Sequence, residues 1–273
     1  MIEIIAEIGW NHGGNMDLAK KMIKAASESG ATYAKFQSWS EKRLVAGVWD
    51  EDGRREIYKK AELDEKKHIE LIEYCNENSI EFLSSAFSIA DAELLSKVNV
   101  KKVKIPSFES RNIDLIKFCD KNFDEIFMSI GTSKYEEALE SISVVKSAKI
   151  SIMHCVSIYP GQYEKANMPK LVKMISELHD ISDSVNRIGY SDHIVGVDSA
   201  KAAIGLGANI IEKHFTTDNN LPGRDNLFSI VPDDLKDLRN FADNFEKMMI
   251  PHGNDFQEGE LETRNNYTGR FDK

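Results

Sequence analysis

The sequence predicts one α/β domain folded as a (β/α)8 TIM barrel. Short β-rich runs alternate with helical patterns from one end of the chain to the other, and eight such strand–helix units fit into 273 residues. An open doubly wound sheet would usually contain fewer strands, and no Gly-x-Gly-x-x-Gly follows the first strand. A closed barrel therefore fits the chain better than an open sheet.

The eight predicted strands are short runs rich in apolar and β-branched residues. They cover Ile2–Ile8, Tyr33–Ser38, Glu81–Ser85, Val100–Ile105, Glu125–Ile130, Lys149–His154, Arg187–Tyr190 and Asn209–Phe215. Between them, apolar residues recur at three- and four-residue intervals, as Leu18, Met22, Ile23 and Ala26 do in the first helical segment. Aspartates stand at three predicted N-caps, Asp17, Asp64 and Asp233. These patterns give each strand a following helix.

Three long connections follow predicted strands: Trp39–Leu63, Val156–Met168 and Thr216–Ile230. All three would lie on the carboxyl-terminal face of the barrel, where this fold builds its sites. No change in composition divides the chain, so we expect a barrel domain over residues 1–250. Residues 251–273 are expected to form a polar C-terminal tail.

Composition excludes several classes of protein. Forty-five acidic residues outweigh 35 basic ones, giving a net charge of −10 that disfavours binding to nucleic acid or to a membrane surface. No apolar run is long enough to span a membrane, and the first residues do not resemble a signal peptide. The three cysteines, Cys75, Cys119 and Cys155, are widely spaced and are expected to be reduced thiols. We therefore expect a cytoplasmic protein.

Polar side chains collect where the predicted strands end. They are Glu7, Lys35, Gln37, Lys104, Ser107, Ser129, Tyr159, Ser191, Asp192, His193, Glu212 and His214. A charged side chain in an apolar strand is costly to bury unless it is paired. A ring of such residues at the mouth of a barrel predicts a binding site there.

The chemistry of this ring suggests an anionic ligand and a metal ion. Lys35 and Lys104 supply cations in an otherwise acidic protein, which suits a small phosphorylated carboxylate. His193 and His214 come from neighbouring strands, so their imidazoles can converge on a divalent ion that keeps positions open for substrate. The alternative is that both histidines are hydrogen-bonded residues at the edge of the core.

Seven short motifs occur in a fixed order and together resemble the N-acetylneuraminate (sialic acid) synthase family. They are Ala6-Glu7-Ile8-Gly9-x-Asn11-His12, Lys35-Phe36-Gln37, Lys104-Ile105-Pro106-Ser107, His154-Cys155-x-x-x-Tyr159-Pro160, Gly189-Tyr190-Ser191-Asp192-His193, Glu212-Lys213-His214-Phe215-Thr216 and Pro222-Gly223-Arg224-Asp225. The resemblance runs from residue 3 to about residue 232. It implies a barrel that condenses phosphoenolpyruvate with the open-chain form of an N-acylated hexosamine.

The resemblance also implies a role for each matching residue. It makes His193 and His214 the ligands of a divalent metal, typically Mn²⁺ in the family, with Mg²⁺ or Co²⁺ as alternatives. Lys35, Gln37 and Ser191 would hold the carboxylate of phosphoenolpyruvate. Its phosphate would be held by Lys104, Ser107, Ser129 and Ser157. Glu7 would orient the sugar and transfer a proton to or from water, and Tyr159, Asp225 and Glu109 would bind substrate.

The expected products are a nine-carbon 2-keto-3-deoxy acid and phosphate, and the expected assembly is a homodimer. Relatives usually carry a small antifreeze-like domain after the barrel, and the resemblance, which covers the barrel alone, leads us to expect a chain without it. Four positions also depart from the family pattern, namely Phe108, Ile130, Ser157 and Arg224. Arg224 adds a cation beside the sugar residues, so we expect it to favour a phosphate or carboxylate on the aldose.

Three other functions are consistent with parts of the pattern. A related synthase could make a seven- or eight-carbon keto-deoxy sugar phosphate. A metal-dependent hydrolase barrel would normally place His-x-His on the first strand, where this chain has Glu7-Ile8-Gly9. A truncated barrel without catalytic activity could serve as an assembly or regulatory partner, and it would bind neither metal nor phosphoenolpyruvate.

Overall fold

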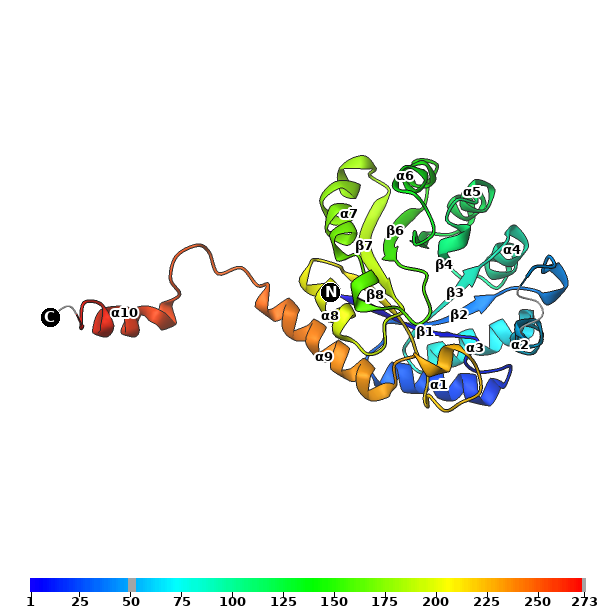
Figure 1. Ribbon diagram of the computed structural model, residues 1–273, viewed down its shortest axis with the longest axis horizontal. Helices are drawn as coiled ribbons and strands as arrows, with labels where there is room; N and C mark the ends of the chain where they lie inside the picture. The colour runs from blue at the N-terminus through cyan, green and yellow to red at the C-terminus, as the bar shows by residue number, and fades with distance from the viewer. Residues whose placement is uncertain (49–52, 272–273) are drawn as a thin grey trace.

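Eight parallel strands close into a barrel in the order in which they occur along the chain (Figure 1). The computed structural model describes residues 1–48 and 53–271. The strands are β1 (Glu3–Gly9), β2 (Tyr33–Ser38), β3 (Glu81–Ala86), β4 (Lys102–Ile105), β5 (Glu125–Ser129), β6 (Lys149–Cys155), β7 (Val185–Asp192) and β8 (Ile210–His214). β8 closes the ring by pairing with β1, so the predicted TIM barrel is confirmed.

Two strands differ most from their predicted bounds. β4 begins at Lys102 rather than Val100, and β7 extends from Val185 to Asp192 beyond the predicted Arg187–Tyr190. β7 is longer because it pairs with β6 from Val185 to Ser191, including polar positions that the β-rich pattern excluded. Backbone pairing, rather than side-chain character, sets the ends of this strand.

Helices connect the strands around the outside of the barrel (Figure 1). They are α1 (Met16–Glu28), α2 (Arg54–Ala61), α3 (Glu65–Glu77), α4 (Ile89–Lys97), α5 (Ile113–Asn122), α6 (Tyr135–Ser143), α7 (Met168–Ile181), α8 (Asp198–Gly205), α9 (Pro232–Met248) and α10 (Leu261–Tyr267). Short 3₁₀ turns also occur: η1 (Glu41–Arg43), η3 (Ser107–Glu109), η4 (Tyr163–Lys165), η5 (Asp225–Leu227) and η6 (Glu258–Glu260). The three long connections predicted from sequence carry α2, η1, η4 and η5.

One of the three predicted N-caps is correct. Asp64 caps α3, and its side chain accepts a hydrogen bond from the backbone of the first turn. The N-cap of α1 is Asn15 and that of α9 is Val231, so Asp17 and Asp233 lie in the first turn instead. Acidic side chains are favoured at the N-cap and in the first turn, because both lie at the positive end of the helix dipole. The sequence pattern therefore does not distinguish the two positions.

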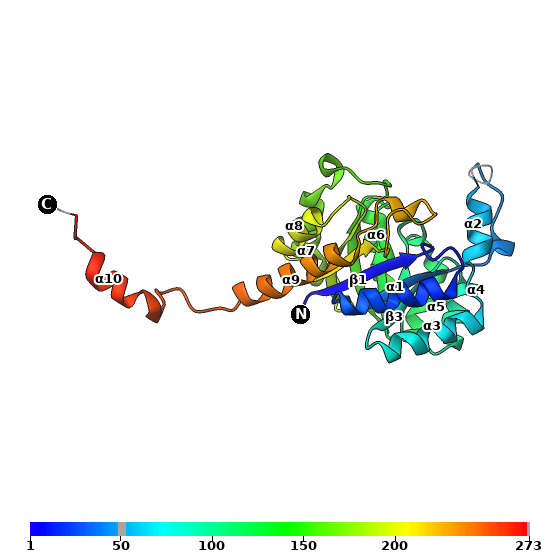
Figure 2. The same ribbon diagram turned by 90° about the horizontal axis from the view of Figure 1, so that it is seen from below.

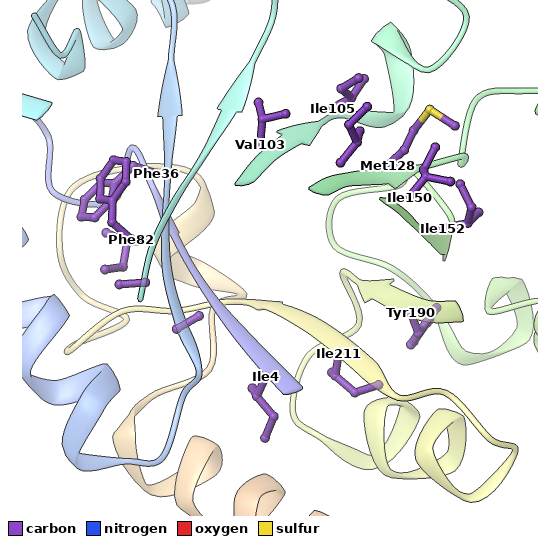
Figure 3. Packing of buried hydrophobic residues seen from close by; sticks show 14 of the residues in the cluster. Ile4, Phe36, Phe82, Val103, Ile105, Met128, Ile150, Ile152, Tyr190 and Ile211 are labelled. Atoms are coloured by element: carbon purple, nitrogen blue, oxygen red, sulfur yellow. The ribbon is translucent and has the colours of Figure 1, made fainter. Parts of the chain in front are cut away.

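The main hydrophobic core lies between the barrel and its helices. Alternate strand residues point outward into it, since side chains on a strand alternate between its two faces. Phe36 of β2 and Phe82 of β3 stack there with ring centroids 5.7 Å apart. Figure 3 shows these rings together with outward-facing residues of the later strands, such as Ile105 and Met128. This outer core leaves the other face of every strand for the barrel interior.

A second, smaller core fills the middle of the barrel. Its members are buried apolar or aromatic residues from six strands: Ile5, Tyr33, Leu83, Phe127, Met153 and Ile210. Tyr33 and Phe127 pack edge to face with their centroids 5.4 Å apart. This apolar layer separates the amino-terminal end of the barrel from the mouth.

Charged side chains close the amino-terminal end, and we call Glu3, Tyr33, Lys102, Glu125 and Arg187 the amino-terminal network. Arg187 lies 2.6 Å from the Glu125 carboxylate and also pairs with Glu3. The Tyr33 hydroxyl donates to Glu3 at 2.9 Å and accepts from Lys102 at 2.9 Å. Burial raises the pKa of Glu125, but Arg187 and neighbouring donors outweigh it and lower the pKa overall. Each charge here therefore has a partner of opposite sign.

The last residues leave the barrel. α9 ends at Met248, residues 249–271 are exposed, and the predicted boundary at residue 250 stays a prediction. Figure 2 shows this tail leaving the barrel in the direction opposite to the one in which β1 points. Among the described residues, no helix combines the length and apolar character that crossing a membrane would require.

Candidate active site

Four charged side chains meet inside the barrel at the carboxyl-terminal ends of the strands. They are Glu7 on β1, Lys35 on β2, Lys104 on β4 and Glu212 on β8, and we call them the ionic quartet. Lys35 Nζ lies 2.7 Å from Glu7 and 3.6 Å from Glu212, and Lys104 Nζ lies 3.7 Å from Glu212. All four are at most 6% exposed. The prediction that both lysines face the lumen is confirmed.

Burial and neighbouring charges together shift the pKa values of these groups. Burial raises the pKa of Glu7, and the neighbouring Glu212 adds to this effect, so Lys35 does not restore the ordinary value. Burial also lowers the pKa of Lys104 despite the attraction of Glu212. For Lys35 burial acts in the same direction, but its two carboxylate neighbours outweigh it and raise the pKa. Groups poised in this way are typical of active sites.

Glu212 is the residue at this site to which the sequence assigned no role. The strand alternation placed it on the same face as His214, but only the closed barrel shows that it lies between the two lysines. Its Oε1 also accepts a hydrogen bond from Ser191 Oγ at 2.9 Å. The sequence did contain a signal for this role, because Glu212 is a charged residue in an apolar strand, two positions before the candidate metal ligand His214.

Gln37 and Ser191, the other two residues predicted to bind the carboxylate, form hydrogen bonds with members of the ionic quartet. Gln37 Nε2 donates to Glu7 Oε1 at 2.6 Å, and Ser191 donates to Glu212. Lys35 also donates to Ser85 Oγ at 3.2 Å, a contact that the sequence did not predict. The predicted carboxylate-binding residues therefore lie within one hydrogen-bonded group.

The hydroxyl groups predicted to hold phosphate lie at or just beyond the carboxyl-terminal ends of β4, β5 and β6. Lys104 Nζ donates to Ser129 Oγ at 2.6 Å, and the backbone N–H of Gly131 donates to Ser107 Oγ at 3.1 Å. A Cβ at Gly131 would lie 2.6 Å from Ser157 Oγ and 2.9 Å from Ser107 Oγ. Glycine at position 131 therefore allows the two hydroxyls to converge, a requirement that sequence reasoning missed.

His193, just after β7, and His214, at the end of β8, lie side by side. Their ring centroids are 5.4 Å apart. His193 Nδ1 lies 2.9 Å from the carbonyl oxygen of Val156, and because a carbonyl only accepts, Nδ1 carries a proton and Nε2 is the nitrogen left to bind an ion. Burial lowers the pKa of His193, but Cys155 and the Val156 carbonyl outweigh it and raise the pKa overall. Burial lowers the pKa of His214 well below its ordinary value, so this ring is neutral. The rings are close enough to share an ion.

The donor set fits an open metal site rather than a closed one. Among residues 1–48 and 53–271, no group of three or more His, Cys, Asp or Glu side chains is arranged to hold a metal ion. His214 Nδ1 is buried without a well-aligned hydrogen bond, although Asp225 lies 3.5 Å away. Two imidazoles, each with a deprotonated nitrogen facing the ion, could bind an ion whose other positions are filled by substrate and water.

Tyr159 and Asp225 flank the histidine pair. The ring of Tyr159 lies over His193, with centroids 4.1 Å apart, and it is 52% exposed. Asp225, in η5, accepts a hydrogen bond from the indole N–H of Trp10. Burial raises the pKa of this carboxyl. Both predicted sugar contacts therefore lie at the mouth, and Trp10 joins them.

Glu109 is the predicted site residue that lies apart from this group. It belongs to η3, and its carboxylate accepts a hydrogen bond from Asn112 Nδ2 at 2.9 Å. This contact ties Glu109 to the N-cap of α5. Its predicted role in substrate binding gains no support from this contact.

The three cysteines are unpaired and buried, as predicted. Cys155 faces the lumen, where its Sγ lies 4.0 Å from His193 Nδ1 and 3.8 Å from Ser157 Oγ. Burial raises the pKa of Cys155, but His193 and Lys104 outweigh it and lower the pKa to about 7. The Cys155 thiol therefore lies beside both His193 of the imidazole pair and the hydroxyl of Ser157.

Sequence comparisons identify relatives that cover most of the chain. An N,N'-diacetyllegionaminic acid synthase of Campylobacter jejuni is 34% identical over 262 residues, covering 90% of this chain and 77% of that protein. A pseudaminic acid synthase of Helicobacter pylori is 31% identical over 242 residues, covering 84% and 69%.

A solved structure has the same barrel. The N-acetylneuraminic acid (sialic acid) synthetase of Leptospira borgpetersenii serovar Hardjo-bovis, in complex with citrate, superposes with a TM-score of 0.84 at 30% identity. The match covers 97% of this chain and 92% of that one. The family model for the NeuB family matches residues 22–253. The chain therefore belongs to the NeuB family.

Proposed function

We propose that this protein condenses phosphoenolpyruvate with an N-acylated aldose, giving a nonulosonic (sialic-acid-like) 2-keto-3-deoxy acid and phosphate. The ionic quartet is the observation that carries the proposal. Two buried ammonium groups beside a set of hydroxyls suit a ligand with a carboxylate at one end and a phosphate at the other. The names of the relatives support the class of product.

Lys35, Gln37 and Ser191 would hold the carboxylate of phosphoenolpyruvate, and Lys104 with Ser129 would hold its phosphate. Both lysines now lie near Glu212, so an incoming dianion would take over part of this pairing. Because the ammonium groups are already fixed by neighbours, little reorganisation would accompany binding. Ser107 and Ser157 would add two hydroxyl donors beside Gly131.

In the reaction, C3 of phosphoenolpyruvate bonds to the aldehyde carbon, water adds to C2, and the C2–O bond to phosphate breaks. Glu7 would take the proton from the attacking water, a role that its raised pKa supports because the carboxylate is then a stronger base. Lys104 would neutralise the charge on the departing phosphate. A divalent ion held by His193 and His214, which we propose to be Mn²⁺, would polarise the aldehyde oxygen.

Tyr159 and Asp225 would contact the sugar hydroxyls from either side of the imidazole pair. Holding both substrates in one lumen would convert a bimolecular encounter into a positioned reaction. We also propose that the protein works in the cytoplasm, where its three free thiols would stay reduced, and that it forms a homodimer.

The test is phosphate release with phosphoenolpyruvate, Mn²⁺ and a panel of aldoses, followed by the mass of the product. We expect turnover with N-acetylmannosamine or a 2,4-diacetamido sugar and its loss in Glu7→Gln. Turnover with arabinose 5-phosphate or erythrose 4-phosphate alone would show a synthase of shorter keto-deoxy sugars instead. If neither Mn²⁺ nor phosphoenolpyruvate gives heat in calorimetry, the protein is a barrel without this activity.

A further inference from the structure

Aromatic residues border half of the barrel mouth, immediately above the ionic quartet. An aromatic residue directly follows each of the first three strands, as Trp10, Trp39 and Phe87, and another, Phe108, stands in η3 after β4. Tyr58 of α2 completes the set. We call these five residues the aromatic arc.

The five rings form one continuous chain of contacts. Trp10 stacks on Tyr58 with centroids 5.0 Å apart, and Trp39 meets Tyr58 edge to face at 5.3 Å. Trp39 then packs against Phe87 at 5.7 Å, and Phe87 against Phe108 at 5.5 Å. Such contacts hold the rings in fixed orientations.

The position of the arc follows from the ends of the strands. Lys35 and Gln37 face the lumen on β2, and Trp39 directly follows the last residue of that strand. Phe87 stands in the same position after β3, two residues beyond Ser85, which contacts Lys35. The arc therefore lies at the carboxyl-terminal ends of the strands that carry the charged residues, at the entrance through which a second substrate would reach them.

One end of the arc contacts the candidate site, and the other end adjoins it in the sequence. At one end, Trp10 donates its indole N–H to Asp225, which lies 3.5 Å from His214. At the other end, Phe108 directly follows Ser107, a member of the proposed phosphate group. The arc therefore spans the mouth between the proposed sugar contacts and the proposed phosphate contacts.

The rings are only partly buried. Phe108 is 54% exposed, and the other four are half-buried. Aromatic faces left beside a polar cavity can bind an apolar part of a ligand, because burying that part removes both surfaces from water. The charged and hydroxyl groups below cannot serve this purpose.

We infer that the aromatic arc is a subsite for the apolar substituents of the aldose, namely its acylamino methyl and any deoxy methyl group. This inference rests on the proposed function and makes it more specific. The arc would favour an N-acylated, deoxygenated aldose over a fully hydroxylated one of the same shape. Recognition would then come from the first half of the barrel, while the metal and hydroxyl contacts come from the second half.

N-acetylmannosamine and mannose test this subsite, because they differ only in the substituent at C2. Trp10 and Trp39 report binding through their fluorescence, so each sugar is titrated without phosphoenolpyruvate and no reaction occurs. We expect the acylated sugar to bind about tenfold more tightly, as expected for one methyl group against aromatic faces. Phe108→Ala and Phe87→Leu should remove most of this preference.

The matched control is Phe256→Ala, because Phe256 is 48% exposed and belongs to the segment between α9 and α10, which Figure 2 shows outside the barrel. It should keep the full preference. The inference is wrong if the wild-type protein shows no preference, or if both arc variants retain it. A parallel phosphate-release assay separates the two proposals. If the protein prefers the acylated sugar but releases no phosphate, the subsite is supported and the synthase activity is refuted. If every variant releases phosphate equally from both sugars, the synthase activity is supported and the subsite is refuted.

Discussion

The two ends of the barrel both bury carboxylates beside cations, but with opposite results. At the amino-terminal end, Glu125 has a lowered pKa because Arg187 and neighbouring donors compensate it. At the mouth, Glu7 has a raised pKa, although Lys35 lies as close as 2.7 Å. The difference is that Glu7 is more deeply buried and lies beside the charge of Glu212, which raises its pKa, whereas Glu125 also accepts hydrogen bonds from Ser151 and Asn186, which lower its pKa.

This comparison separates a structural network from a functional one. The amino-terminal network satisfies its charges and closes the barrel, whereas the ionic quartet holds charges whose best partners would come from a ligand. Between the two ends, the apolar layer around Leu83 and Phe127 separates the two groups of charges. Variants at the two ends should therefore affect different properties, stability at one and activity at the other.

The largest expected effect is on activity, for two lysines of the same strand. Lys104→Met removes a charge from the quartet, and kcat/KM should fall by about 100- to 1,000-fold, as it does when one preorganised donor is lost. Lys102→Met, two residues earlier in the amino-terminal network, should lower the melting temperature and leave kcat/KM within about threefold. Equal losses of kcat/KM in the two variants would contradict the comparison.

A divalent ion should stabilise the protein through the mouth alone. At an Mn²⁺ concentration 100 times the dissociation constant, the free energy of unfolding should rise by about 2.7 kcal/mol, measured by chemical denaturation. His214→Gln should abolish this increase, because one of the two imidazoles is lost. His252→Gln, in the exposed tail, is the control and should retain it. Stabilisation that survives His214→Gln would place the ion elsewhere.

Matched carboxylate variants should differ in stability. Glu125→Gln weakens the partner of Arg187 and should lower the free energy of unfolding by about 2 kcal/mol. Glu7→Gln removes a charge that the folded protein buries at a cost, so it should be neutral or slightly stabilising while abolishing activity. Urea denaturation at pH 7 measures both. A loss of stability in Glu7→Gln as large as that in Glu125→Gln would remove the distinction.

The pH dependence of these variants has a definite sign. The folded-state pKa of Glu125 is lowered, so its stabilisation is full above the ordinary pKa of 4.5 and is lost as the pH falls through the folded value. The stability gap between the wild type and Glu125→Gln should therefore close on acidification. The folded-state pKa of Glu7 is raised, so its cost is present at neutral pH and disappears as the group protonates. Unfolding curves from pH 7 to pH 3 would show both trends.

The smallest expected effect concerns Arg224, which lies near enough to Asp225 for its charge to lower that carboxyl's pKa, though burial raises it overall. If the aldose carries an anionic group, Arg224→Ala should raise its KM about fivefold, corresponding to about 1 kcal/mol for an exposed pair. The KM of a neutral aldose should not change. If Arg224→Ala raises the KM of neutral and anionic aldoses equally, Arg224 does not recognise an anionic group on the aldose.

The sequence predicted the barrel, its strands and the shared faces of Lys35 with Gln37 and of Glu212 with His214, because alternation and helical periodicity are local properties. It therefore placed Lys35, Lys104 and Glu7 in the lumen correctly. Glu109 shows the limit, since it lies beyond the strand, where alternation no longer specifies direction. The N-caps of α1 and α9 show a second limit, because an acidic residue at the start of a helix can cap it or lie within its first turn.

By itself, the sequence determined which residues share a strand and which face of that strand they occupy. Only the tertiary structure decided that Glu212 lies between two lysines, that Gly131 lets two hydroxyls converge, and that five separate aromatic residues form one arc. These relations join residues from strands far apart in the chain, and closure of the barrel brings them together. The physical reason is that local propensity sets a side chain's direction, whereas its partners depend on packing across the lumen.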